Sequence, residues 1–264
     1  MVRGLLASVM VGILCAVMGT YVVLRGMAFL GDAMSHAILP GVAIAFLLHG
    51  NLLVGAIIAA VIVAFSIGFF SKGGAVKEDT AIGILFAAAL SLGVALISSI
   101  QTYAVDLSHI LFGNVLGVSV SDLWLTAGLG LLVLAAVALL YKQFLVISFD
   151  PILAATLRLP AELLRNVMLV LLALTVVVSL QTVGVGLAAA MLVTPAATAY
   201  LLTRRLWPMM VVSATIGAVS SLVGLYLSYY LNIVSGSAIV LTATAIFLVV
   251  FLFHPRRGLI WKKR

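Results

Sequence analysis

Long runs of apolar residues dominate this chain, and short polar or basic interruptions separate them. Helices are the natural form for such runs, because a helix needs about 20 apolar residues to cross a hydrocarbon core and satisfies its own backbone there. The runs do not alternate between apolar and polar positions, which excludes the strands of a membrane barrel. The pattern predicts an all-α integral membrane protein, a single polytopic helical bundle over residues 1–264 with about nine transmembrane helices, or eight as the alternative count. The runs are 4–24, 26–48, 52–71, 80–100, 123–141, 166–180, 187–203, 208–231 and 237–253.

Two stretches fit this pattern less well. The runs 166–180 and 187–203 are short, and polar residues and glycines divide them. They are either two spans joined by a tight outer turn or a broken pair of half-helices, and the pattern leaves both open. Residues 101–122 are too apolar for a free loop and too interrupted for a span. We interpret them as a re-entrant or surface segment on the outer side.

Composition excludes a soluble or disordered chain. Apolar residues make up 65% of the sequence, charged residues only 8%, and the mean hydropathy is +1.37. Soluble domains carry roughly a quarter of their residues as charges, and disorder needs the opposite composition. The single cysteine, Cys15, excludes a disulfide framework and a cysteine zinc site, and we interpret it as a thiol in the core.

The basic residues follow the alternation of the connections. Every Lys and Arg except Arg3 lies after the first, third, fifth, seventh or ninth run. The positive-inside rule therefore places these connections and the C-terminus in the cytoplasm and the N-terminus outside. The formal net charge of +7 is thus explained by topology and does not indicate nucleic-acid binding. The residues are Arg25, Lys72, Lys77, Lys142, Arg158, Arg165, Arg204, Arg205, Arg256, Arg257, Lys262, Lys263 and Arg264.

Asp32 and His36 are the only carboxylate and histidine within the nine runs. A charged carboxylate inside a bilayer costs about 2.5–3.5 kcal/mol, so Asp32 should face a cavity or a partner. The i, i+4 spacing places both side chains on one helical face, and together they offer oxygen and nitrogen donors suited to a divalent transition metal. An Asp–His hydrogen bond that locks two helices and a metal-free proton relay are the alternatives.

Two ligands are too few for Mn²⁺ or Zn²⁺. Another helix, water or a second copy of the chain must supply the others. A two-fold axis along the path would give two Asp and two His.

Small residues recur at four-residue spacing in two runs. These ladders favour close packing against other helices. They are Gly83, Ala87, Ser91 and Ala95 in one run, and Gly186, Ala190, Thr194 and Thr198 in the other.

The sequence lacks the motifs of several enzyme classes. It has no G-x-x-x-x-G-K-[ST] phosphate loop, no H-E-x-x-H and no G-x-S-x-G. We therefore expect the chain not to be an enzyme and any ATP hydrolysis to occur in a separate subunit.

One long motif carries a family resemblance. Residues 31–41 read GDAMSHAILPG, and around this string the chain resembles the membrane subunits of bacterial ATP-binding-cassette (ABC) importers for manganese, zinc or iron. Further segments carry the likeness along nearly the whole chain: 77–83, 111–116, 149–151, 157–160, 192–198 and 253–259.

The resemblance implies a permease like those of type II ABC importers. Its partners would be a second copy of itself, a cytoplasmic ATPase on each half and an extracytoplasmic metal-binding protein. Asp32 and His36 match the family's pathway ligands. The resemblance also implies a cytoplasmic coupling segment, residues 142–165, whose contact residues to the ATPase are Asp150, Pro151, Leu157, Arg158, Leu159 and Pro160.

The residues themselves agree on the coupling segment. Pro151 and Pro160 bracket a stretch long enough for about two helical turns. Its apolar residues suit docking to a protein, and a helix lying on the lipid surface is the alternative. Such a surface helix would usually be lysine-rich, and this stretch has one basic residue, so we favour docking.

These observations predict an importer permease in the bacterial cytoplasmic membrane, embedded in lipid and without a permanently bound cofactor. The transported metal would be manganese, favoured by the overall resemblance, with zinc and then iron as alternatives. An ion-coupled secondary carrier without an ATPase is one rival function. A permease for a metal chelate or a vitamin, which would need a wider path, is the other.

Overall fold

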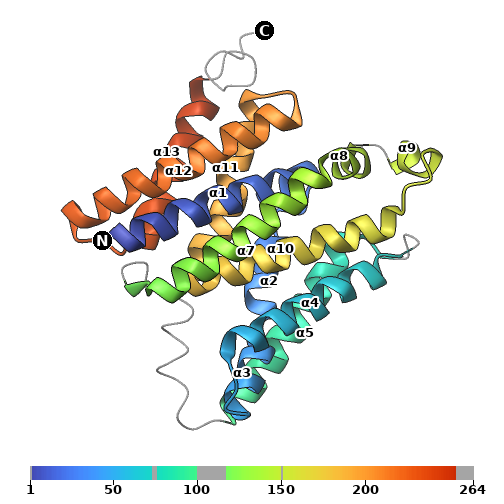
Figure 1. Ribbon diagram of the computed structural model, residues 1–264, viewed down its shortest axis with the longest axis horizontal. Coiled ribbons are helices and arrows are strands. Elements are labelled where there is room, and N and C mark those ends of the chain that lie inside the picture. Colours follow the sequence, from blue (N-terminus) through green and yellow to red (C-terminus); the bar gives the residue numbers. More distant parts are fainter. Residues whose placement is uncertain (1, 73–75, 100–116, 150, 254–264) are drawn as a thin grey trace.

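The computed structural model describes residues 2–72, 76–99, 117–149 and 151–253. Within these ranges every regular element is a helix (Figure 1). The helices are α1 (Val2–Leu24), α2 (Leu30–Ala37), α3 (Leu39–Leu47), α4 (Leu52–Phe70), α5 (Glu78–Ser98), α7 (Val120–Leu139), α8 (Tyr141–Phe149), α9 (Pro151–Thr156), α10 (Ala161–Val183), α11 (Val185–Leu202), α12 (Leu206–Leu231) and α13 (Ser235–Phe253).

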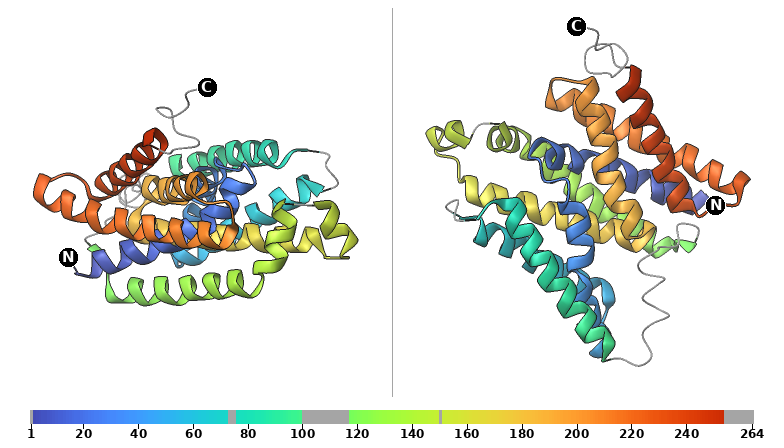
Figure 2. Two further views of the ribbon diagram at one scale, coloured as in Figure 1. Left: turned by 90° about the horizontal axis from the view of Figure 1, so that it is seen from above. Right: turned by 180° about the vertical axis from the view of Figure 1, so that it is seen from behind.

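The helices form two groups, one of α1, α7, α11, α12 and α13 and one of α3, α4 and α5. Contacts of α10 and α2 join the two groups. Helices α1, α7, α10 and α11 occupy the middle, with α12 and α13 on one side and α3, α4 and α5 on the other (Figures 1 and 2). Helix α10 contacts α1 and α7 in the first group and α4 in the second, and α2 contacts α10, α11 and α5. The short helix α2 therefore lies between the two groups.

The most extensive contact between helices joins the beginning of the described chain to a helix near its end. A Cβ atom on Gly12 of α1 would lie 2.9 Å from the Gly217 carbonyl oxygen of α12, so only glycine permits this approach. Two hydroxyls cross the same contact: Ser213 donates to the Ala16 carbonyl at 2.8 Å and Ser221 to the Ser8 carbonyl at 2.9 Å. These bonds replace the apolar driving force that lipid removes between membrane helices.

The membrane prediction is confirmed. Eight helical stretches of the described chain are long and apolar enough to span a membrane, with α2 and α3 counted together as Leu30–Leu47. The apolar part of α11, Gly186–Leu202, is shorter than these eight. Each of the nine predicted runs thus coincides with helix.

The doubtful region 166–203 consists of two helices and one tight turn. Helix α10 begins at Ala161 and ends at Val183, well beyond the predicted 166–180, and α11 begins at Val185. Gly184 alone makes the turn, with φ 86° and ψ 168°, a conformation that glycine adopts easily and other residues avoid. The half-helix alternative is therefore wrong here.

Two further predictions differ from the structure. The predicted connection after residue 141 begins as helix α8, because Phe144 is buried and its ring meets that of Tyr21 edge to face at 5.6 Å. Helix α7 begins at Val120, capped by the Ser119 hydroxyl. Most of the predicted outer segment 101–122 lies outside the described residues.

The two small-residue ladders differ in their surroundings. On α11 Thr198 is buried and Ala190 and Thr194 are half-buried, although Gly186 is exposed, whereas Ala87, Ser91 and Ala95 on α5 are all exposed. No heavy atom of the described chain comes within 4 Å of a Cβ built on Gly83. The α5 ladder is thus not covered by the described part of this chain.

Candidate functional site

The predicted helix 26–48 is broken in the middle. Residues 25–29 form a turn, α2 covers Leu30–Ala37, and α3 starts at Leu39 after a single residue, Ile38. Pro40, the second residue of α3, lacks the N–H that would continue the helical bonding to the His36 carbonyl, and its ring crowds the preceding turn. The prediction of one continuous helix was wrong, and the visible Pro40 was the signal for the break.

Asp32 and His36 lie on the same face of α2, as the spacing predicted. His36 Nε2 is 3.7 Å from Asp32 Oδ1, which is longer than a hydrogen bond. The Asp32 side chain is 45% exposed and that of His36 is 29% exposed. Neither polar group is sealed inside the chain.

An aromatic ring of α5 borders the imidazole. Phe86 meets His36 edge to face with ring centroids 5.9 Å apart, and it packs in the same way on Phe29, just before α2. The apolar wall limits where the imidazole can turn. The Asp32 side of the pair stays open.

The described part of the chain does not complete a metal site around this pair. The described residues contain no group of three or more His, Cys, Asp or Glu side chains that could hold a metal ion. The carboxylate and imidazole can contribute two donors, so a complete metal site at this place needs donors from outside the chain, such as water or another subunit.

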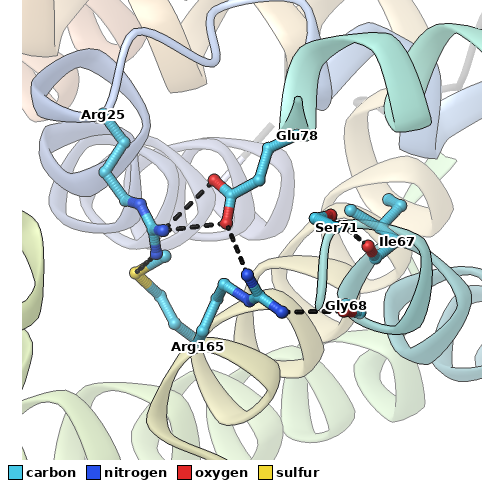
Figure 3. A network of polar contacts seen from close by, with 7 residues as sticks. Arg25, Ile67, Gly68, Ser71, Glu78 and Arg165 are labelled. Atoms are coloured by element: carbon cyan, nitrogen blue, oxygen red, sulfur yellow. Dashed lines mark hydrogen bonds and ion pairs between the residues drawn. The ribbon is translucent and has the colours of Figure 1, made fainter. Parts of the chain in front are cut away.

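A second polar cluster joins three of the predicted cytoplasmic connections (Figure 3). The Arg25 Nη2 donates to both carboxylate oxygens of Glu78, at 2.9 and 3.1 Å. Arg165 Nη1 lies 3.6 Å from Glu78 Oε1, and its Nη2 donates to the Gly68 carbonyl at 2.7 Å. The three charged side chains are 15–20% exposed. Burial lowers the pKa of Arg25, while the Glu78 carboxylate acts in the opposite direction.

Sequence reasoning did not foresee this triad of Arg25, Glu78 and Arg165. It treated the arginines as markers of topology and Glu78 as part of a family motif. Their assignment to the same side of the membrane was the available signal, because it allowed them to meet. A third ion pair at this end, Lys72 with Glu162 at 3.2 Å, is more than half exposed.

The coupling segment has a short helix at its centre. Helix α9 covers Pro151–Thr156, and Leu157, Arg158 and Pro160 are exposed, with Leu157 at 55%. Arg158 adopts a left-handed conformation, with φ 53°, where the chain turns towards α10. Leu159 is half-buried, Pro160 occupies the cap position of α10, and Asp150 lies outside the described residues. The prolines bracket a helix as predicted, although it has six residues, fewer than the predicted two turns.

The comparison with known families identifies the chain. The sequence pattern described as "ABC 3 transport family" matches residues 1–254. The chain belongs to the ABC 3 transport family. The resemblance to importer permeases that the GDAMSHAILPG motif predicted is thereby confirmed.

Members of the ABC 3 transport family with high similarity carry manganese in their names. The manganese transport system membrane protein MntC of Listeria monocytogenes is 49% identical over 262 residues, which is 99% of this chain and 93% of that protein. MntC of Halalkalibacterium halodurans is 47% identical over 258 residues, 98% of this chain and 88% of that protein.

A solved structure in this family has the same fold. The structure of PsaBC from Streptococcus pneumoniae in complex with Fab aligns with a TM-score of 0.85 at 41% identity, covering 97% of this chain and 92% of that chain. The arrangement of helices described above is therefore that of the matched PsaBC chain.

Proposed function

We propose that this chain is the membrane subunit of an ABC importer that moves manganese into the bacterial cytoplasm. The observation that carries the proposal is the open Asp32–His36 pair on α2, between the two groups of helices. A carboxylate and an imidazole that are close but not hydrogen-bonded retain free lone pairs for a passing cation. The family and the names of its members support manganese as that cation.

The transport path lies between two copies of the chain. The described part of the chain offers two donors here, and the partial exposure of both supports a path that a second copy completes. A two-fold axis beside α2 gives two Asp and two His. Four donors from two protomers bind the ion tightly enough to select it and release it when the protomers separate, as conduction requires.

The orientation follows from the charges. The triad and the Lys72–Glu162 pair bring the connections after α1, α4 and α9 together at one end of the molecule. We assign this end to the cytoplasm by the positive-inside rule. The C-terminus is then cytoplasmic, and an extracytoplasmic metal-binding protein delivers the ion at the opposite end.

The coupling segment binds the ATPase through residues 150–160. The exposed side chains of Leu153, Leu157 and Arg158 give an apolar contact with one charge, which suits a protein partner. We assign the other predicted contact residues, Asp150, Pro151, Leu159 and Pro160, to the same partner. ATP hydrolysis in the partner then moves α9 and separates the two halves.

Metal uptake by cells carrying Asp32→Ala or His36→Ala tests the pathway role, with protein levels in the membrane matched. We expect each substitution to reduce manganese uptake at least about tenfold, since a lost ligand typically costs 10- to 100-fold in metal affinity or activity. His49→Ala is the matched control, because His49 is an exposed histidine in the turn before α4. Unimpaired uptake in both pathway variants contradicts the proposal.

Purification of the complex tests the transport class. Co-purification of an ATP-binding subunit supports an ABC importer. Uptake that persists without such a subunit, and that follows an ion gradient, contradicts it and indicates a secondary carrier. Competition by zinc and iron for manganese uptake then ranks the three metals.

A further inference from the structure

Glu78 occupies an unusual position, because its single carboxylate is shared by two arginines from different segments. Arg25 approaches to 2.9 Å and Arg165 to 3.6 Å, and all three side chains are largely buried. A buried guanidinium without a carboxylate is costly. Glu78 therefore compensates both arginines at once, and any movement of one of them changes its contact with the other.

The Arg165 side of the triad is linked rigidly to the coupling segment. The Leu159 N–H donates to the Ala154 carbonyl of α9 at 3.0 Å, and the Ala161 N–H donates to the Leu159 carbonyl at 2.8 Å. Arg165 follows on α10 about one turn later. A displacement of α9 thus reaches Arg165 through a short path of backbone hydrogen bonds.

The Arg25 side is linked just as closely to the metal pair. Arg25 begins the turn that leads into α2, and this turn is fixed at both ends: the Met27 N–H donates to the Val22 carbonyl at 3.0 Å, and the Leu30 N–H to the Met27 carbonyl at 2.9 Å. Asp32 follows two residues after Leu30. The position of Arg25 therefore determines where α2, and the carboxylate of Asp32, begins.

We propose that Glu78 is the positioning residue that couples the ATPase-binding segment to the metal pair. Movement of α9 shifts Arg165, Glu78 follows it, and Arg25 carries the shift into the start of α2. This inference rests on the proposed importer function and adds to it the residue through which ATP hydrolysis acts on Asp32. Coupling between sites requires an element with two discrete arrangements, and we infer that these are the triad with its ion pairs formed and the triad with them separated.

A purely structural role is the alternative. In that case Glu78 holds α5 to α1 and α10, and its loss reduces stability without changing the number of ATP molecules used per ion. The two roles therefore differ in a measurable ratio, which does not depend on the amount of folded protein.

The test uses the complete transporter, with its ATP-binding subunits and metal-binding protein, in proteoliposomes. Manganese uptake and ATP hydrolysis are measured on the same sample for wild type and Glu78→Gln, which keeps the shape of the side chain and removes its charge. We expect the ATP consumed per imported ion to rise about tenfold, within the range of typical coupling energies. A ratio within about twofold of wild type overturns the proposal.

Two substitutions of charged residues near Glu78 serve as matched controls. Asp79→Asn removes the neighbouring carboxylate, which is exposed, and Lys72→Gln removes the exposed ion pair that also reaches α10. Both should leave the ratio of ATP to ion unchanged. An equal rise in either control assigns the effect to general charge at this end of the molecule and overturns the specific role of Glu78.

A second variant covers the case in which Glu78→Gln does not assemble. Arg165→Lys keeps the charge, but a lysine cannot hold the Gly68 carbonyl and Glu78 with a planar fork as Arg165 does. We expect an intermediate rise in the ratio for this variant, and a normal ratio overturns the proposal.

Asp32→Asn in the same assay separates this inference from the proposed function. If Asp32→Asn abolishes uptake while Glu78→Gln and Arg165→Lys have normal ratios, the metal path stands and the coupling role of Glu78 fails. If Asp32→Asn transports normally, the proposed metal path fails.

Discussion

Glu78 receives two hydrogen bonds from Arg25, at 2.9 and 3.1 Å, and neither side chain is more than 20% exposed, whereas Asp32 lies 3.7 Å from His36 with 45% of its side chain exposed. Both clusters place a carboxylate beside a nitrogen-bearing side chain near helix ends in one polypeptide. The first is satisfied within the chain, and the second is not. Their geometry thus distinguishes an ion pair that is completed within the described chain from a pair that is open to a ligand.

The difference has a physical reason. A buried charge is tolerated when its partners are all present, so a structural ion pair must be complete before a ligand arrives. A site for a passing ion must be incomplete before the ion arrives, because its donor atoms have to be free to bind the metal. A donor–acceptor distance slightly longer than a hydrogen bond, together with partial exposure of both side chains, is therefore more informative about transport than the residue types alone.

The largest effect is expected when the open pair is neutralised. Asp32→Asn and His36→Gln keep the approximate shape of the side chains, so bound manganese in the purified complex should fall more than about tenfold. Thermal stability should change little, because no hydrogen bond joins the pair. Elemental analysis and a thermal unfolding curve check both statements. Unchanged metal content contradicts the assignment of the open pair.

The complete cluster should show the opposite response. Glu78→Ala leaves Arg25 and Arg165 without their carboxylate, and we expect the free energy of unfolding to fall by about 2–3 kcal/mol, somewhat less than for a fully buried pair. Thermal unfolding of the purified protein in detergent measures this loss. A change no larger than that of an exposed ion pair would show that the cluster is not structurally important.

Gly93 tests whether the position of the open pair depends on α5. A Cβ at Gly93 would lie 2.8 Å from Leu39 Cβ, at the break that follows His36. Gly93→Leu should therefore cost about 1–3 kcal/mol and lower manganese uptake. Gly83→Leu is the control on the same helix, because that position is open within this chain. Equal loss of stability in the two variants contradicts the role of this contact.

The smallest effect is expected for the exposed pair. The side chains of Lys72 and Glu162 are 64% and 55% exposed, so Lys72→Ala should change the free energy of unfolding by no more than about 0.5 kcal/mol. The same unfolding assay measures it. A loss as large as that of Glu78→Ala would contradict the dependence on burial used throughout this comparison.

The helices themselves were largely predictable, because lipid requires long apolar runs with internally bonded backbones. The alternation of the basic residues predicted that Arg25 and Arg165 lie on the same side, and in the structure both contact Glu78. The i, i+4 spacing placed Asp32 and His36 on one face of α2. These features depend on local sequence and on the surrounding solvent.

The features that sequence reasoning missed depend on tertiary contacts. The length of α10 was underestimated because its first residues, Ala161 to Arg165, include the charged Glu162 and Arg165, which interrupt the apolar run in the sequence. Helix α8 was missed because its burial against Tyr21 involves a residue far away in the chain. Which arginines share Glu78 is likewise decided by packing of α1, α5 and α10, which no local pattern specifies.

The Gly12–Gly217 contact has a consequence for biosynthesis. Helix α1 is synthesised before the other described helices, yet the helix with which it makes its most extensive contact is α12, the second-to-last of the described chain. Until α12 is inserted, the surface of α1 around Gly12 therefore faces acyl chains, which the apolar sequence of α1 tolerates. The contact between α1 and α12 can form only after α12 has been inserted. Truncation before α12 therefore leaves α1 without its largest packing partner.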